Sequence, residues 1–189
     1  AVAALGQAAF ANLRVDPDDF VRSVELIEEP AAGQDAPLTR SVALSMAEKF
    51  LGAQARFEQG ELHLAGHLIP TAGRRTITIN YPGPAGTFPR VSLCDFLSAA
   101  RAGRADHLER WVSGKAVLLG KDMIDDRHAT PFYTLSPGLR ANTAGVEIHA
   151  AALSTLLTRR YLQEAPQPAR FAALFAPSAA TAAVAATLG

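Results

Sequence analysis

A short apolar run, SGKAVLLG, limits the folds available to this chain more than any other feature. It spans residues 113–120 and has no polar residue between Ala116 and Leu119, a pattern typical of a strand covered on both faces. Roughly two dozen residues separate it from a helix predicted to start near Ala144, and connections of that length are usually functional. The run therefore predicts a buried strand, a binding loop over residues 121–145 and a covering helix.

The remaining elements complete an α/β fold with a mixed central sheet covered by at least three helices. A helix is predicted after Leu38, with Val42, Met46, Lys49 and Phe50 at helical spacing and Gly52 as its C-terminal stop. A second helix should start at Ser92, its N-cap. Strands or hairpins are predicted over residues 18–27, residues 55–70 around Gly60, and residues 74–84.

Composition allows one sizeable core and excludes several classes of protein. The chain has 189 residues, 49% of them hydrophobic, and 18 basic residues balance 18 acidic ones, so no general field favours nucleic acid. Cys94 is the single cysteine, which excludes an internal disulfide framework and a multi-cysteine metal site. Its place at the edge of a helical apolar stripe predicts a small buried thiol.

The C-terminal end carries an uncharged run, Phe171 to Gly189, after a proline-marked boundary. About 20 apolar residues are needed to cross a bilayer, and this run is slightly shorter and interrupted by Pro177. From length and composition, it is either the first part of a membrane helix that is cut short or a helical tail that packs on the domain.

Acids and histidines gather near the predicted helix start, at Asp125, Asp126, His128, Glu147 and His149. Residues two apart on a helix point about 200° apart, so Glu147 and His149 should not reach one ion. His149 falls within the apolar stripe of the helix and is predicted to be buried. Glu147 falls on the polar side, where the helix dipole favours an acid, and Thr143 is the candidate N-cap.

The stretch DDRHATP, residues 125–131, has two interpretations that the sequence leaves open. It follows a predicted buried strand, where α/β folds usually bind ligands. Alternatively, it is a self-bonded turn, with Asp126 accepting from backbone N–H groups and Thr130 preparing the bend into Pro131. No nucleophile elbow and no phosphate-binding loop occurs in the sequence.

The order of these segments resembles the later part of the bacterial CHASE domain of type 2, a sensory module associated with cyclases and histidine kinases. The resemblance covers the chain from about Leu5 to Tyr161. Its most specific part is GKAVLLG, followed by D-x-x-x-T-P and then GVEIHA. The weaker segments are VDPDDFVRSVELI, SVALSMAEKFLG and INYPGPAGTFPRVSLCDFL.

The resemblance implies an input domain on the periplasmic or extracytoplasmic side of the cell membrane. Residues 1–165 would form the sensory domain, and residues 166–189 a linker and the start of a truncated membrane helix. The parent protein would carry an adenylate or guanylate cyclase, a histidine kinase or a Ser/Thr kinase as its output. The family's N-terminal portion would be absent, which would leave an exposed sheet edge for a second copy.

On this interpretation the domain is not an enzyme and uses no cofactor, metal or catalytic residue. The ligand-binding or loop-organising candidates are Asp126, His128, Thr130, Glu147 and His149, and the signal is an unidentified small molecule or protein. The partners further include a second copy of the chain and exclude nucleic acid. One alternative is a metal-assisted hydrolase using Asp126, His128 and His149. Another is a structural dimerisation module.

Overall fold

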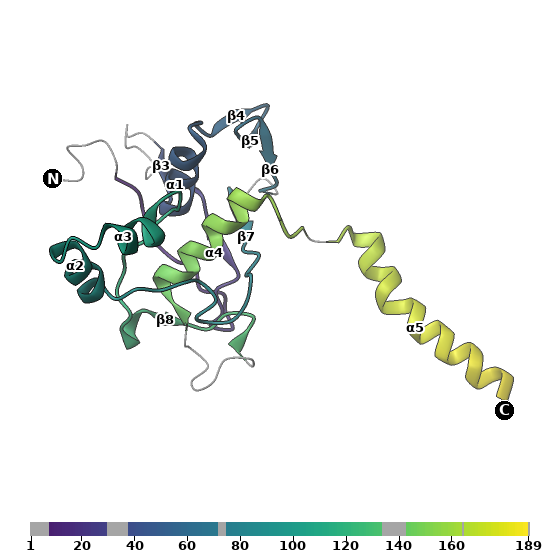
Figure 1. The fold of residues 1–189 in the computed structure, drawn as a ribbon. Helices are drawn as coiled ribbons and strands as arrows, with labels where there is room; N and C mark the ends of the chain where they lie inside the picture. The colour runs from purple at the N-terminus through teal and green to yellow at the C-terminus, as the bar shows by residue number, and fades with distance from the viewer. Residues whose placement is uncertain (1–7, 30–37, 72–74, 134–142, 164, 189) are drawn as a thin grey trace.

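The computed structural model describes residues 8–29, 38–71, 75–133, 143–163 and 165–188 (Figure 1). Two helices in the middle of the domain organise the rest: α1 (Val42–Leu51) packs against α4 (Gly145–Thr158). Both helices bury alanines, which lets their backbones approach closely. The class is mixed α/β, as predicted from the order of the segments.

The ends of α1 are those that the sequence predicts. The Ser41 side chain caps the first turn by accepting a hydrogen bond from the Leu44 N–H, and Gly52 ends the helix in the left-handed region at φ 64°. The helix buries Ala43, Leu44 and Ala47, and Met46 packs against the core, whereas Phe50 is 52% exposed. Contact with α4 favours the face with small residues over the face with the largest ones.

Several small antiparallel sheets replace the predicted mixed central sheet. The strand predicted over residues 18–27 is divided into β1 (Ser23–Glu25), which pairs with β7 (Thr76–Thr78), and β2 (Ile27–Glu28), which pairs with β3 (Thr39–Arg40). The pairing changes partner at Leu26, whose N–H donates to the Arg75 carbonyl and whose carbonyl accepts from the Ser41 N–H. Near the helix start, β8 (Arg127–His128) pairs with β9 (Thr143–Ala144).

The hairpin predicted around Gly60 is present and is extended by one strand. β4 (Arg56–Glu58) and β5 (Glu61–Leu64) pair across a turn in which Gly60 has φ 85°. A second turn at Ala65 and Gly66 then brings in β6 (His67–Ile69). Both turns use positive φ angles, which glycine adopts without steric cost.

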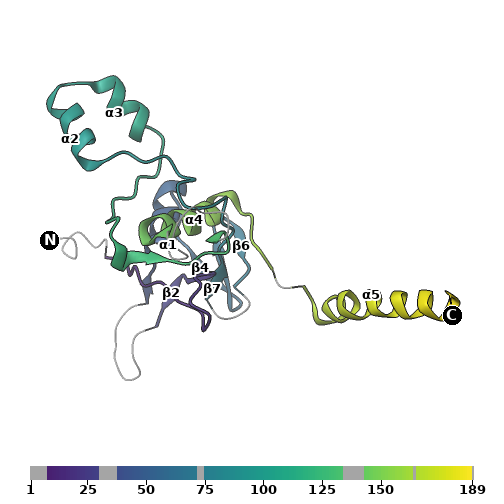
Figure 2. The same cartoon turned by 90° about the horizontal axis from the view of Figure 1, so that it is seen from below.

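Two further helices project from the domain, as Figure 2 shows: α2 (Leu93–Arg101) and α3 (Ala105–Val112). The predicted N-cap is confirmed, because Ser92 Oγ accepts from the Asp95 N–H at 3.0 Å. The predicted buried thiol is wrong, because Cys94 is exposed. Its helix packs mainly on α3 through Phe96 and Trp111 instead of inserting into the core.

The predicted strand over residues 113–120 is not formed. This segment has neither strand nor helix hydrogen bonding, and Val117 and Leu119 are exposed. The described residues offer no strand beside it to supply backbone partners. Its end is nevertheless fixed, since a Cβ atom at Gly120 would lie 2.5 Å from Val146 Cβ in the first turn of α4.

The C-terminal helix α5 (Gln167–Leu188) extends away from the other elements in both views (Figures 1 and 2). Its described apolar side chains, such as Phe171, Leu174 and Phe175, are exposed. The alternative of a tail packed on the domain is therefore wrong. In the described part of the chain, α5 included, no helix combines the length and apolarity that a membrane crossing needs.

Candidate functional site

The start of α4 is where the predicted loop and helix residues meet. The N-cap residue is Ala144, which makes no side-chain cap, so the predicted capping role of Thr143 is wrong. Thr143 instead belongs to β9, and its buried hydroxyl lies 3.4 Å from the hydroxyl of Thr130. The helix is therefore anchored by a two-stranded ladder and a buried hydroxyl pair.

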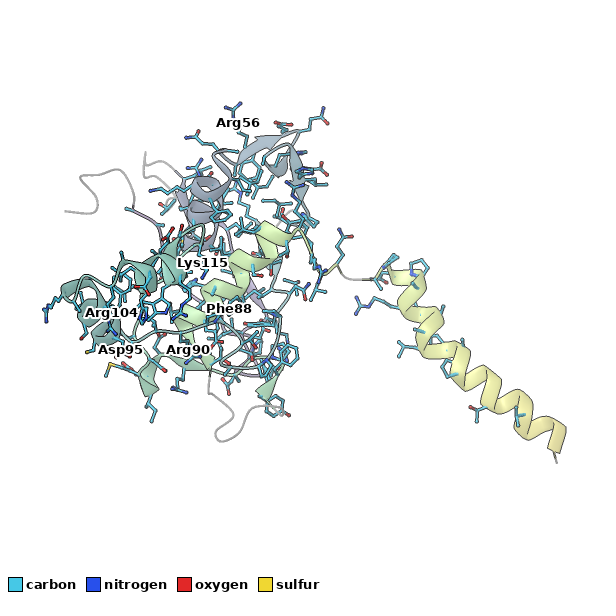
Figure 3. All side chains as sticks on the ribbon, viewed as in Figure 1. Arg56, Phe88, Arg90, Asp95, Arg104 and Lys115 are labelled. Atoms are coloured by element: carbon cyan, nitrogen blue, oxygen red, sulfur yellow. The ribbon has the colours of Figure 1, made fainter. Side chains whose placement is uncertain are left out.

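Glu147 is the central side chain of the site. It is 7% exposed, which contradicts its predicted place on the polar side of the helix. A strap of residues 82–91 passes over this side and supplies two donors: the Gly86 N–H lies 2.8 Å from Glu147 Oε1, and Nη2 of Arg90, which is labelled in Figure 3, bonds Oε2. A helix face that looks polar in isolation is thus covered by a distant segment.

The strap holds its own shape through a local turn. Gly86 has φ 88°, and the Thr87 hydroxyl donates to the Pro84 carbonyl at 2.6 Å. A Cβ atom at Gly83 would lie 2.5 Å from Thr87 Oγ1. This folded turn presents the Gly86 N–H toward α4, so the carboxylate meets a preformed donor.

The charged network continues from Glu147 to the loop after residue 120. Arg90 Nη1 lies 3.4 Å from Asp122 Oδ2, and Arg127 Nη2 donates to Asp122 Oδ1 at 2.6 Å. These four side chains, Arg90, Asp122, Arg127 and Glu147, are hereafter the Glu147 cluster. Two cations alternate with two carboxylates, so the cluster is electrically balanced, with the buried Glu147 at one end and the half-exposed Arg90 between the two carboxylates.

Asp126 and His128 lie beside the same helix start. Their side chains are 3.4 Å apart, from Asp126 Oδ1 to His128 Nε2. A Cβ atom at Gly145 would come within 2.5 Å of Asp126 Oδ1, so this carboxylate approaches the backbone where only glycine leaves room. The sequence candidates Asp126, His128, Thr130 and Glu147 are therefore brought together around the first turn of α4.

His149 points elsewhere, toward the N-terminal segment. It is 8% exposed, as its place in the apolar stripe predicts, and its Nε2 lies 3.1 Å from the Ala11 carbonyl oxygen. Its Nδ1 is buried and finds no partner among the described residues. Glu147 and His149 thus contact different segments, in agreement with the helical projection.

The alternative metal site is not assembled. Within residues 8–29, 38–71, 75–133, 143–163 and 165–188, no group of three His, Cys, Asp or Glu side chains is arranged to hold a metal ion. His149 Nε2 is engaged by the Ala11 carbonyl, and Asp126 and His128 pair with each other. The hydrolase hypothesis therefore lacks the three-ligand set that it requires.

Arg22 organises a turn next to this site. It binds Asp16 at 2.8 Å and Asp18 at 2.7 Å, and the hydrogen bonds from Arg22 lower the pKa of Asp18 to about 2. The Val21 N–H that follows this turn donates to the Ala129 carbonyl at 2.9 Å. Arg22 and its two aspartates thus close a turn whose next residue bonds to the loop that carries Asp126 and His128.

Sequence reasoning missed Arg90, Asp122, Arg127 and Gly86 as members of the site. Arg90 and Glu147 are 57 residues apart, and no local pattern joins them. The usable signal was indirect: PGPAGTFPR, residues 82–90, is rich in turn residues and ends in a cation, and a buried acid needs such a partner.

The buried imidazole predicts a pH-dependent stability. Burial lowers the pKa of His149 below its ordinary 6.5, so the unfolded chain takes up a proton more readily than the folded one. Stability is fully present above pH 6.5 and decreases as the pH falls toward the folded-state pKa. Urea unfolding at pH 7.5 and 5.5 should show this loss, and His149→Gln should reduce it. His67→Gln, at an exposed site, should leave the slope unchanged; an unchanged slope in His149→Gln would contradict the assignment.

Comparison with known proteins places the chain among the extracellular sensor domains of signalling proteins. It belongs to the CHASE2 domain family, whose model matches residues 1–188. No curated protein and no solved structure matches it. The family predicted from the segment order is therefore confirmed.

Proposed function

We propose that the chain is the input domain of a bacterial membrane-bound signalling protein, lying on the extracytoplasmic side of the membrane. It would relay binding of a small molecule or protein to a cytoplasmic adenylate or guanylate cyclase, histidine kinase or Ser/Thr kinase. The observation that carries this proposal is the buried Glu147 at the start of the core helix α4, held by the strap through Gly86 and Arg90. Membership of a sensor family supports it.

The geometry supports α4 as the element that carries the signal. The Glu147 cluster contacts the first turn of α4. Asn80, which follows β7, forms hydrogen bonds with residues at the other end of this helix. The Asn80 N–H donates to Thr155 Oγ1 at 3.0 Å, and its side-chain amide donates to the Arg160 carbonyl at 2.9 Å. Beyond this end the chain leads into α5, the proposed linker and membrane-helix start. A displacement of α4 would thus be transmitted to the segment that leads into α5.

A signal acts only if it binds one of two arrangements more tightly than the other. The proposed arrangements differ in whether Arg90 is paired with Glu147. Arg90 is 47% exposed, so a ligand or partner has access to it, whereas Glu147 is buried and costly to leave unpaired. Binding that withdraws Arg90 would therefore favour movement of the strap relative to α4. Asp126, His128 and Thr130 would organise the adjoining loop first and contact the signal second.

The test is made on the complete signalling protein in membranes, with the rate of its output enzyme as the readout. Arg90→Gln should change the output rate by about fivefold or more, because it removes the contact that distinguishes the two arrangements. Arg56→Gln is the matched control, since Arg56 lies on exposed β4 at the other end of the domain (Figure 3). Equal output rates in the two variants, at equal protein level, would overturn the role of the cluster.

A further inference from the structure

Residues 116–119 have the burial pattern of a strand without its partners. Ala116 and Leu118 pack against the core, while Val117 is 54% and Leu119 79% exposed. Such alternation is the period of an extended chain with one face inward. Across the described residues, the backbone groups of these four positions make no hydrogen bond.

Both the backbone and the outer face of this segment need covering. Exposed sheet edges are usually protected by charges or proline, whereas here two aliphatic side chains point outward. The segment is also held in position, because Ala116 and Leu118 are packed and Gly120 lies against Val146. An apolar edge that is held in position and has no backbone partner among the described residues is suited to binding an added strand, which supplies hydrogen bonds and side-chain contacts together.

The flanking charges define what that strand carries. Lys115 and Lys121 are exposed at the two ends of the segment, and Lys115 Nζ donates to the Arg110 carbonyl, which leaves its other protons available. We propose that residues 115–121 bind an extended segment from outside this chain, with two aliphatic residues two positions apart flanked by carboxylates. The carboxylates would face Lys115 and Lys121, and the aliphatic pair would cover Val117 and Leu119.

A second copy of the chain fits this edge poorly. Two identical antiparallel strands related by a two-fold axis pair residues of the same face. The register that covers Val117 with the partner copy's equivalent of Leu119 also places Lys115 opposite the equivalent of Lys121. Like charges directly opposite each other destabilise a strand pair. Charge complementarity therefore favours an acid-flanked strand over self-association.

The chain does not contain such a strand itself. Its acids lie six residues apart at Asp19 and Glu25 and at Glu29 and Asp35 only. The first pair encloses Val21 and Ser23 at alternate positions, and the second encloses Ala31 and Gly33, so neither carries two large aliphatic side chains. The occupant is accordingly a segment that residues 1–189 do not supply.

Peptide binding to the whole 189-residue chain tests the proposal. The probe is a fluorescent peptide TETVTLTET, and its counterpart TKTVTLTKT carries lysines at the flanks. Fluorescence anisotropy should show saturable binding of the glutamate peptide only, with amide NMR shifts centred on residues 115–121. Added salt should weaken this binding, because exposed ion pairs are screened.

Three variants make the test specific. Val117→Thr combined with Leu119→Thr should weaken binding about tenfold or more by removing apolar contact. Val15→Thr, at another exposed valine, is the matched control and should bind as the parent does. Lys115→Glu combined with Lys121→Glu should reverse the preference toward the lysine peptide.

Three results would overturn the proposal: neither peptide binds, both bind equally, or the charge-reversed variant keeps its preference for glutamate. Sedimentation gives an independent check of the occupant. A dimer of the parent chain that Val117→Thr combined with Leu119→Thr dissociates would show that a second copy covers the edge. Because every variant carries substitutions at exposed positions, circular dichroism should report an unchanged fold for each one.

Discussion

Replacing Glu147 by alanine is expected to lower the free energy of unfolding by about 2 kcal/mol. The substitution removes a buried carboxylate that accepts from the Gly86 N–H and from Arg90. Losing one partner of a fully buried ion pair costs about 3 to 5 kcal/mol, but Arg90 is half-exposed and water can solvate it after the change. The remaining cost comes from the Gly86 N–H and from the empty space beneath the strap.

Urea unfolding followed by circular dichroism measures this loss at neutral pH. Glu58→Ala, an exposed acid on β4, is the matched control and should stay within about 0.5 kcal/mol of the parent. Glu147→Gln should fall between the two, because the amide oxygen can still accept from Gly86 while the charge opposite Arg90 is lost. If Glu147→Ala unfolds like Glu58→Ala, the strap is not held by this carboxylate.

Local signals in the sequence were sufficient to place several elements. Ser41 and Gly52 bound α1, Gly60 turns the first hairpin, and Ser92 caps α2, because each acts on hydrogen bonds within a few residues of itself. The helix beginning near Ala144 is likewise present as α4. These features depend little on the rest of the fold.

Burial was predicted less well, because it depends on what lies opposite each surface. Residues 113–120 have the composition of a buried strand, but no described strand lies beside them, so Val117 and Leu119 are exposed. Cys94 is exposed for a related reason: α2 packs mainly on α3 instead of inserting into the core. In both cases the apolar residues occur at the predicted spacing, but the described residues supply no element that covers the exposed ones.

The candidate site contains one feature that follows from local helix geometry and one that depends on a distant segment. Helical projection correctly separated Glu147 from His149, since their directions follow from the helix itself. It wrongly left Glu147 on a polar surface, because the covering strap lies about 60 residues earlier in the chain. The turn-rich segment of residues 82–90 was visible in the sequence, but only the fold shows that its Gly86 and Arg90 are the partners of Glu147.

Replacing Ile148 by alanine is expected to have the largest effect, a loss of about 3 to 4 kcal/mol in the free energy of unfolding. Ile148 is fully buried in α4 and belongs to the core cluster together with residues of α1 and the strands. Truncation leaves a cavity that the surrounding side chains fill only partly, and buried aliphatic truncations of this kind cost about 2 to 5 kcal/mol. Helix propensity does not oppose the loss strongly, since alanine gains only a few tenths of a kcal/mol over isoleucine.

Leu119→Ala provides the matched control for that measurement. Leu119 is also a large aliphatic residue, but it is 79% exposed, so its truncation should change stability by less than about 0.5 kcal/mol. Thermal and urea unfolding of the two variants should therefore differ widely, with equal m-values if both unfold in one step. A loss of stability in Leu119→Ala as large as that in Ile148→Ala would mean that residues 116–119 are already covered in solution, and the open edge proposed as a strand-binding surface would then be occupied.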